Sequence, residues 1–219
     1  MRWTKVLIPA AALAVGLGAG AGGVGLLLNR PALSGAGPGG GSGMMGGLGG
    51  MMGGGADIAG GAPGGLVPAR QMAALAATEA RTVLRQGSTL TYRSHRVRLV
   101  ALGAPGARPG MYWQVDGAIN PTVSVPAGSV ITVDFADGDP GQPHGFELTT
   151  AAPPYARMAM MAGPIAAPGA FIMPVPPPKG TLWYAATVTF RAPAPGTYYY
   201  LCPVPGHAQQ GMWGKLIVR

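Results

Sequence analysis

The sequence predicts an all-β domain in the C-terminal part of the chain, a sandwich or barrel of antiparallel strands with about 130 residues. Short runs rich in β-branched and aromatic residues alternate there with Gly, Pro and Asp, and no run is followed by a long helical segment. Charged residues make up 10% of the chain, below the usual share of about a quarter, whereas 39 glycines and 23 prolines supply turns. Few charges and many turn formers are typical of a domain built from short strands.

Residues 1–30 form a predicted membrane anchor. An uncharged apolar run extends over 6–28, preceded by Arg2 and Lys5 and followed by Arg30. A spanning helix needs about 20 apolar residues and a signal-peptide core only about 7 to 15, so the length favours an uncleaved anchor over a cleaved signal. Because positive residues stay on the cytoplasmic side, the rest of the chain is expected on the extracytoplasmic face, in the periplasm or at the cell surface.

Residues 31–66 form a predicted flexible linker, because this stretch consists almost entirely of Gly, Ala, Ser, Pro and Met. Such a composition cannot bury enough apolar surface to offset the entropy of ordering the backbone. Two methionine pairs, Met44-Met45 and Met51-Met52, interrupt the linker. Thioethers bind Cu(I), so a copper-collecting role is the alternative to methionines that are incidental in a coil.

The predicted domain covers residues 67–219 and begins with an amphipathic helix over 67–85. Apolar residues such as Met72 and Leu75 recur there at helical spacing, and Gly87 ends the pattern. Strands are expected wherever β-branched and aromatic residues lie between turn residues. The predicted strands are 89–92, 97–102, 111–115, 122–125, 130–136, 145–149, 182–191, 197–202 and 214–218.

The net charge of +8 suits nucleic acid, an anionic membrane surface or an acidic protein partner. The sequence contains no run of Arg or Lys interleaved with aromatic residues, so nucleic-acid binding is not expected. Cys202 is the single cysteine, which excludes an intramolecular disulfide. Because exposed thiols are oxidised outside the cytosol, a lone exported cysteine is expected to be buried or bound to a metal.

Residues with metal-binding chemistry gather near the C-terminus. Cys202, His207 and Met212 are each separated by four residues on a loop that contains prolines and glycines. A thiolate, an imidazole and a thioether, completed by a second imidazole, form the ligand set of copper electron-transfer sites, whereas zinc ordinarily takes no methionine. The second imidazole is expected from His144, where the strand pattern resumes after a polar turn. The alternative, His95, lies in a polar turn typical of a solvated side chain.

Each of these residues, taken singly, could also have an ordinary structural role. Cys202 could be an ordinary buried cysteine, His207 a turn residue and Met212 a core side chain. Their joint spacing, in a chain whose sole cysteine is predicted to be exported, favours the copper site.

Three stretches of the sequence resemble the cupredoxins. The first is GTYYYLCPVPGHAQQGMWGKLIV at 196–218, the second PHGFELT at 143–149 followed by PPYA at 153–156, and the third NPTVSVPAG at 120–128. The resemblance covers residues 68–219. It implies a Greek-key β-sandwich with an N-terminal helical extension, a high-potential type 1 copper and tolerance of acid.

Two features depart from the usual cupredoxin pattern. Ser or Asn usually follows the first histidine ligand and braces the ligand loops, whereas Gly145 follows His144 here, so that only the backbone N–H can reach the sulfur. The anchor and the Gly/Met-rich linker resemble those of the membrane-bound sulfocyanins, which share a similar loop from Cys to Met.

The resemblance implies a blue-copper electron carrier, not an enzyme, that cycles between Cu(I) and Cu(II) in an extracytoplasmic respiratory chain of the iron-oxidising kind. The expected partners are redox proteins, a c-type cytochrome, a terminal oxidase or both, and the carrier is expected to be a monomer. In cupredoxins the ring edge of the second histidine ligand reaches the surface within an apolar patch, here expected around Pro205, Ala208 and Trp213. The alternative function is copper delivery or storage in the cell envelope, in which the methionine pairs would bind the metal.

Overall fold

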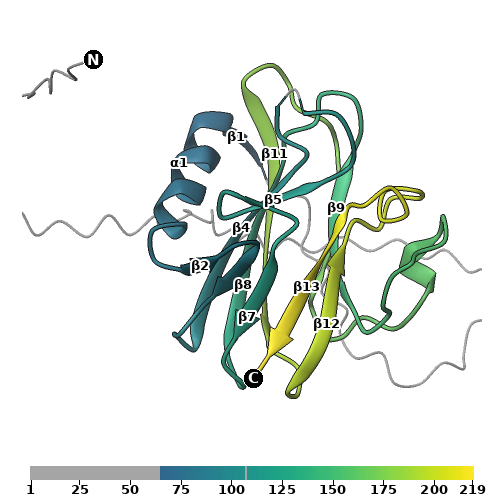
Figure 1. The fold of residues 1–219 in the computed structure, drawn as a ribbon. Helices are drawn as coiled ribbons and strands as arrows, with labels where there is room; N and C mark the ends of the chain where they lie inside the picture. Colours follow the sequence, from purple (N-terminus) through teal and green to yellow (C-terminus); the bar gives the residue numbers. More distant parts are fainter. Residues whose placement is uncertain (1–64, 107) are drawn as a thin grey trace, which may run out of the picture. The chain divides into compact units, whose positions relative to one another are not determined.

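The computed structural model describes residues 65–106 and 108–219, which form two facing β-sheets (Figure 1). One α-helix and one 3-10 turn complete the secondary structure of this described part, so the all-β fold predicted from the sequence is confirmed. The elements are β1 (Leu66–Pro68), α1 (Ala69–Glu79), β2 (Leu84–Gln86), β3 (Thr89–Thr91), β4 (Arg96–Gly103), β5 (Trp113–Val115), β6 (Ala118–Ile119), β7 (Thr122–Val125), β8 (Val130–Asp137), β9 (His144–Thr149), η1 (Ala159–Met161), β10 (Phe171–Val175), β11 (Leu182–Arg191), β12 (Gly196–Leu201) and β13 (Trp213–Val218).

The two sheets contain parallel as well as antiparallel pairs. The first has the strand order β1-β11-β8-β4-β5-β6 and the second β10-β9-β12-β13-β7-β3-β2. β4 runs parallel to β8, and β7 runs parallel to both β3 and β13. The prediction of an antiparallel sandwich or barrel is therefore corrected at these three parallel pairings. Alternation of apolar and polar residues reveals a strand but not its direction, which depends on how the connections cross between the sheets.

Trp113 lies fully buried at the centre of the core between the sheets. Its ring meets Phe135, Phe146 and Tyr200 edge-on, with centroid separations of 5.8, 6.1 and 6.3 Å. Phe135 belongs to β8 of the first sheet, whereas the other two rings belong to β9 and β12 of the second. Such edge-to-face pairs contribute about 0.5–1.5 kcal/mol each beyond their buried area, so this cluster ties the two sheets together.

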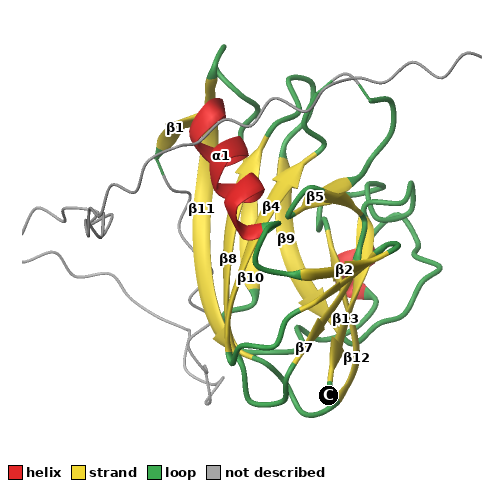
Figure 2. Cartoon of the chain, turned by 60° about the vertical axis from the view of Figure 1, so that its left-hand side comes forward, coloured by secondary structure: helices red, strands yellow, loops and turns green. Residues whose placement is uncertain are grey.

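Helix α1 covers the outer face of the six-stranded sheet, as Figure 2 shows. Met72 and Ala76 are its buried residues and pack against β4 and β8. The helix is shorter than the predicted 67–85, because residues on both sides of it join the sheets. β1 pairs with β11 and β2 pairs with β3, so backbone hydrogen bonds at two sheet edges override the helical spacing of the side chains.

Strand β10 was not predicted from the sequence, because its residues FIMPV include Pro174 and lead into further prolines. It is the edge strand of the seven-stranded sheet, a position where a missing N–H is tolerated. β10 pairs with β9 in a register that shifts between Ile172 and Val175, and Val175 lies opposite His144. This irregular edge strand therefore borders the residues from which the site is built.

The predicted anchor and nearly all of the predicted linker, with its methionine pairs, lie outside the described residues. Within the described part, no helix combines the length and the apolar character needed to cross a bilayer. The division into anchor, linker and domain at residues 30 and 66 stays a prediction.

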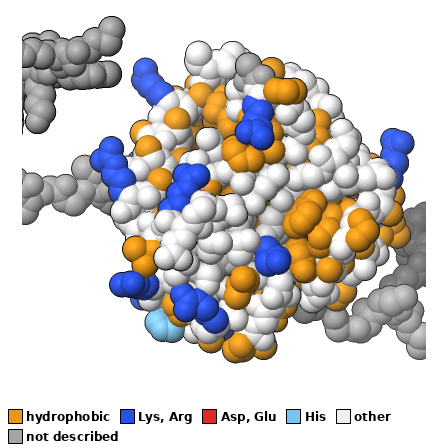
Figure 3. All heavy atoms as spheres, in the orientation of Figure 1, with side chains coloured by type: hydrophobic (Ala, Val, Ile, Leu, Met, Phe, Trp, Pro, Cys, Tyr) orange, Lys and Arg blue, Asp and Glu red, His pale blue; other side chains and the backbone are white. Residues whose placement is uncertain are grey.

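Acidic side chains are withdrawn from the surface. No acidic residue of the described part is exposed, whereas its arginines are, and Figure 3 shows a face with basic but no acidic side chains. The buried acids are Asp116, Asp134, Asp137 and Glu147, and the half-buried ones are Glu79 and Asp139. The net positive charge of the domain is therefore carried on its surface.

Asp116 is a buried acid that links three segments of the chain. Its carboxylate accepts hydrogen bonds from the Val100 N–H, at 3.0 Å, and from the Tyr92 hydroxyl. Burial raises the pKa of Asp116 to about 6. Because this folded pKa lies above the ordinary value of 3.8, the folded protein holds the proton more tightly than the unfolded chain. The resulting stability is complete below about pH 4 and is lost as the pH rises through about 6.

Asp116→Asn is expected to flatten the fall in unfolding free energy between about pH 4 and pH 7, since an amide does not titrate there. A shift of about two pKa units corresponds to a change on the order of 3 kcal/mol. Urea unfolding of the wild type and the variant across this range measures both slopes. Two parallel curves would show that Asp116 does not contribute to the pH dependence.

Candidate metal centre

The four predicted copper ligands come from neighbouring parts of the seven-stranded sheet. His144 is the first residue of β9, Cys202 follows the last residue of β12, and His207 and Met212 lie on the connection to β13. β9 and β12 are antiparallel neighbours, with Leu201 opposite Glu147, so the start of one strand and the end of the other lie at the same end of the sandwich (Figure 1).

Backbone hydrogen bonds close the connection between β12 and β13 into a compact loop. The Cys202 N–H donates to the Met212 carbonyl at 3.1 Å, and the Met212 N–H donates to the His207 carbonyl at 3.0 Å. Gly206 has a φ of 89°, which favours glycine, and its N–H donates to the Arg157 carbonyl at 2.7 Å. The loop is thus fixed both internally and to the segment that precedes η1.

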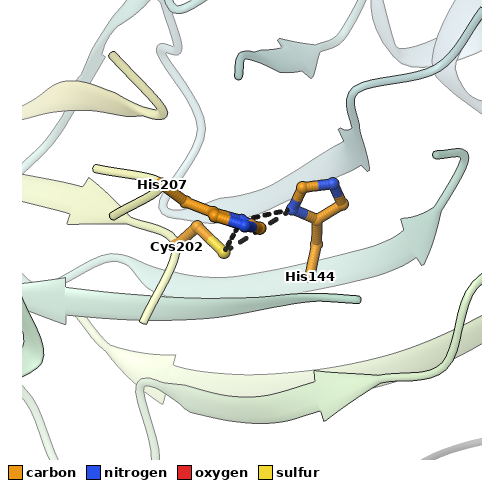
Figure 4. A group of neighbouring side chains, drawn as sticks. All are labelled: His144, Cys202 and His207. Atoms are coloured by element: carbon orange, nitrogen blue, oxygen red, sulfur yellow. Dashed lines mark hydrogen bonds between the residues drawn. The ribbon is translucent and has the colours of Figure 1, made fainter. Parts of the chain in front are cut away.

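The side chains of His144, Cys202 and His207 point toward one another in a buried cluster (Figure 4). The two Nδ1 atoms of the histidines are 3.1 Å apart. Cys202 Sγ lies 3.5 Å from His207 Nδ1 and 3.7 Å from His144 Nδ1. The exposed fraction of His207 is 2%, and the other two side chains are fully buried. The structure therefore brings together three of the four residues that the sequence predicted.

The three atoms fit a single metal ion. A point about 2 Å from each corner exists in a triangle of this size, and bonds from a first-row metal to imidazole nitrogen or thiolate sulfur measure about 2.0–2.3 Å. Both Nε2 atoms face an acceptor, so both Nδ1 atoms present lone pairs, and a cation bound between them would relieve their mutual repulsion. A thiolate with two imidazoles is a donor set that suits copper, so the residues present fit a copper ion.

One loop, residues 138–143 between β8 and β9, holds the outer edges of both imidazoles. His144 Nε2 lies 3.1 Å from Asp139 Oδ2, and His207 Nε2 lies 2.8 Å from Gln142 Oε1. Metal-binding histidines usually donate their second N–H to a carboxylate or carbonyl in this way. The sequence did not single out either partner, although the polar run DGDPGQP before His144 was a signal that could have found them.

Burial determines the protonation of the site. It lowers the pKa of His144, against the opposing effect of Asp139, and together with the neighbouring His144 it lowers the pKa of His207 to about 4. Burial raises the pKa of the Cys202 thiol to about 12, although the backbone N–H groups of Gly145 and Val204 donate to the sulfur. Both imidazoles are thus neutral and available as ligands, whereas the thiol would lose its proton to the solvent only when a metal cation binds the sulfur.

Met212 lies on the same loop and is fully buried in the core that contains Cys202. Its carbonyl also accepts a hydrogen bond from Trp113 Nε1, at 3.2 Å, so the central aromatic cluster supports this end of the loop. The backbone of Met212 is therefore firmly placed, and its role as the fourth ligand stays a prediction.

Two glycines make room for the site. A Cβ at Gly145 would lie 2.6 Å from the Ile172 carbonyl oxygen and 2.8 Å from Pro174 N, so the backbone of β10 leaves no space for a side chain. A Cβ at Gly103, the last residue of β4, would lie 3.0 Å from the Cβ of His144. The sequence did not reveal the role of Gly103, because a glycine at a strand end signals only a turn or a close approach.

The surface beside His207 differs from the expected apolar patch. Both His207 and Ala208 are buried, with exposed fractions of 2% and 1%, so the expectation of an exposed ring edge next to Ala208 is wrong. Pro205 is exposed and Trp213 half-buried. The difference arises because Gln142 covers the ring edge, while Ala208 packs beneath the segment that contains η1.

His95, the alternative ligand, is exposed just before β4. β4 runs from Arg96 to Gly103, which packs on His144. At a rise of about 3.3 Å per residue, this separates His95 from the site by roughly 20 Å or more. The sequence-based choice of His144 over His95 agrees with this placement.

Comparisons with known proteins extend these observations. The sulfocyanin (SoxE) domain matches residues 184–219. Rusticyanin of Acidithiobacillus ferridurans is 38% identical over 133 residues, which cover 61% of this chain and 68% of the relative. Auracyanin-B of Chloroflexus aurantiacus is 35% identical over 105 residues, which cover 44% of this chain and 45% of the relative. The solved structure of rusticyanin from Thiobacillus ferrooxidans has a TM-score of 0.65 at 34% identity, covering 71% of this chain and 96% of that one.

Gly145→Ala is expected to destabilise the domain, because the added methyl group meets the backbone of β10 rather than a movable side chain. Overpacking of this kind costs roughly 1–3 kcal/mol of unfolding free energy. Gly196→Ala is the matched control, since its Cβ would make only an ordinary contact, 3.4 Å from the Tyr198 hydroxyl. Urea unfolding measures both. Equal unfolding midpoints for the two variants would show that the backbone of β10 can move to accommodate the methyl group without loss of unfolding free energy.

Proposed function

The chain belongs to the rusticyanin-like cupredoxins, and from this premise we propose that it is an electron carrier of the blue-copper type. Its cofactor is a single type 1 copper ion. The observation that carries the proposal is the buried triangle of His144 Nδ1, Cys202 Sγ and His207 Nδ1, with sides of 3.1, 3.5 and 3.7 Å. Two imidazoles and a thiolate are the strong ligands of copper sites that transfer single electrons.

We propose that His144, Cys202 and His207 would hold the copper ion as strong ligands and that Met212 would bind it weakly. When bound, copper supplies a one-electron couple between Cu(I) and Cu(II). The chain itself orients both Nδ1 atoms toward the sulfur, which receives two backbone N–H groups. Catalytic metal sites keep an open coordination position for substrate, whereas Met212, as a fourth donor beside the three buried side chains, would leave none, which supports a carrier rather than an enzyme.

A rigid ligand loop supports the same function. The hydrogen bond between Cys202 and Met212 closes the loop, and Pro203 and Pro205 restrict its backbone. The Nε2 atom of each imidazole is hydrogen-bonded, in His144 to Asp139 and in His207 to Gln142, so each ring is fixed at its outer edge as well as through its own backbone. Groups that are already in place need not reorganise when charge changes, so a site of this kind favours fast exchange of electrons.

We propose that redox partners dock beside the ligand loop, on the segment around η1. This segment exposes Met158, Met160 and Met161, with exposed fractions of 44%, 41% and 77%, and the bond from Gly206 to the Arg157 carbonyl ties it to the loop. Flexible methionines suit small, short-lived interfaces. The partner proposed is a c-type cytochrome, a terminal oxidase or both, in an extracytoplasmic respiratory chain, and the basic surface would steer an acidic partner.

We also propose that residues 1–30 hold the carrier, as a monomer on its linker, at the extracytoplasmic face of a membrane. The second candidate function, copper delivery or storage, would depend on the methionine pairs of the linker. The burial of all three convergent ligands supports the carrier, since a delivery site has to release its metal readily.

Cu(II)-loaded protein is expected to be intensely blue and to bleach reversibly on reduction, whereas a delivery protein that prefers Cu(I) stays colourless. Cys202→Ala is expected to abolish the colour, because the thiolate is lost. His95→Ala, at the far end of the domain, is the control that retains it. Absorption spectra with copper stoichiometry provide the measurement. A blue Cys202→Ala protein, or a colourless wild type, would refute the proposed function.

Met212→Leu is expected to retain copper and to raise the reduction potential, because a weak donor that favours Cu(II) is removed. Each tenfold shift of the equilibrium toward Cu(I) raises the potential by about 59 mV, so a rise of about 60–120 mV corresponds to a ten- to hundredfold shift. Voltammetry measures the potential and metal analysis the copper content. Complete loss of copper would show that Met212 holds the metal rather than tuning it.

A further inference from the structure

The edge of His207 that points away from the metal pocket is covered by one exposed side chain. Gln142 Oε1 lies 2.8 Å from His207 Nε2, and the ring itself is only 2% exposed. Gln142 is therefore an exposed side chain in direct contact with the outer edge of this predicted ligand.

Hydrogen bonds within the turn at residues 137–144 fix the position of Gln142. Asp137 accepts the Asp139 N–H at 3.0 Å, and Asp139 in turn accepts the Gly141 N–H at 2.7 Å. Pro143 follows Gln142 and leads into His144, whose N–H also donates to Asp137 at 3.0 Å. The turn that places Gln142 is thus the same one that places the first histidine.

The atom of Gln142 that faces the ring fixes the tautomer of His207. An amide oxygen accepts hydrogen bonds only, so Nε2 must carry the proton and Nδ1 must present a lone pair. That lone pair points toward Cys202 Sγ, 3.5 Å away. In the opposite tautomer an N–H at Nδ1 would block the pocket where the three donors converge.

We propose that Gln142 is the positioning residue of His207: it holds the ring in the Nε2–H tautomer, closes the ring edge to water and is the outermost group between this ligand and a partner. This inference rests on the proposed function, because it takes His207 as a ligand. A hydrogen bond accepted from Nε2–H makes the imidazole a stronger donor at Nδ1, which favours Cu(II) over Cu(I).

Three variants test this role. Gln142→Leu keeps the bulk of the side chain but removes the acceptor, and Gln142→Glu keeps an acceptor at the same reach. Gln209→Leu is the matched control, because Gln209 is exposed on the ligand loop and a change there leaves the bond from His207 to Gln142 in place. Two-bond 15N–1H correlation spectra of the metal-free proteins identify the tautomer of His207. Copper affinity and reduction potential are then measured on the loaded proteins.

The wild type, Gln142→Glu and Gln209→Leu are expected to show a single Nε2–H tautomer, and Gln142→Leu a mixture. Loss of such a partner typically weakens metal binding by about 10- to 100-fold, so Gln142→Leu is expected to lose at least about tenfold in copper affinity. The reduction potential of Gln142→Leu is expected to be higher than that of the wild type, and the reduction potential of Gln142→Glu is expected to be lower.

A Gln142→Leu protein with the wild-type tautomer and potential would overturn the inference. Failure of the wild type to bind copper would instead refute the proposed function. The spectra of the metal-free proteins would still decide whether Gln142 sets the tautomer, so the two failures are distinguishable.

Discussion

The structure depends on holding three electron-rich atoms close together in a place that water does not reach. Two imidazole nitrogens at 3.1 Å, with a sulfur 3.5 and 3.7 Å away, do not attract one another, so the surrounding backbone has to hold them. Support comes from inside the sandwich. Trp113 donates to the Met212 carbonyl, and Asn120 receives the Trp113 N–H at 2.8 Å and donates to the Gly211 carbonyl at 3.0 Å. The core that joins the sheets therefore also closes the ligand loop.

Acid acts on this fold in two opposite directions. Burial raises the pKa of Asp116 to about 6, of Glu147 to about 7 and of Asp137 to about 8, so these groups stabilise the fold below about pH 4 and lose that contribution as the pH rises through their folded values. His207, with its pKa lowered to about 4, has the opposite sign: its contribution is present above about pH 6.5 and is lost as the pH falls toward 4. The histidines therefore make the metal-free site the acid-sensitive part of the domain.

The sequence predicted the site more fully than the topology, for physical reasons. Spacing along one loop fixes Cys202 and His207 relative to each other, and a strand pattern marks His144, so local signals were enough. Gln142 and Gly103 act across the fold, on ligands distant in sequence. The polar run around Gln142 marks a turn but does not show that it contacts His207, and a glycine at the end of a strand does not show that it packs on His144. The parallel pairing of β4 with β8 and the edge strand β10 were equally out of reach, since both depend on which strands meet after the chain crosses between sheets.

The withdrawal of carboxylates into the interior has a consequence for encounters in acidic surroundings. Apart from Lys179 and Lys215, the basic residues of the described part are arginines, and guanidinium groups keep their charge at any ordinary pH. Few carboxylates lie on the surface of the described part, so the basic groups that an approaching partner meets keep their charge when the surroundings are acidified. A partner that is attracted through carboxylates on its own surface would lose its negative charge when these groups are protonated. The pH at which steering fails would then be set by the titration of the partner and not by that of the carrier.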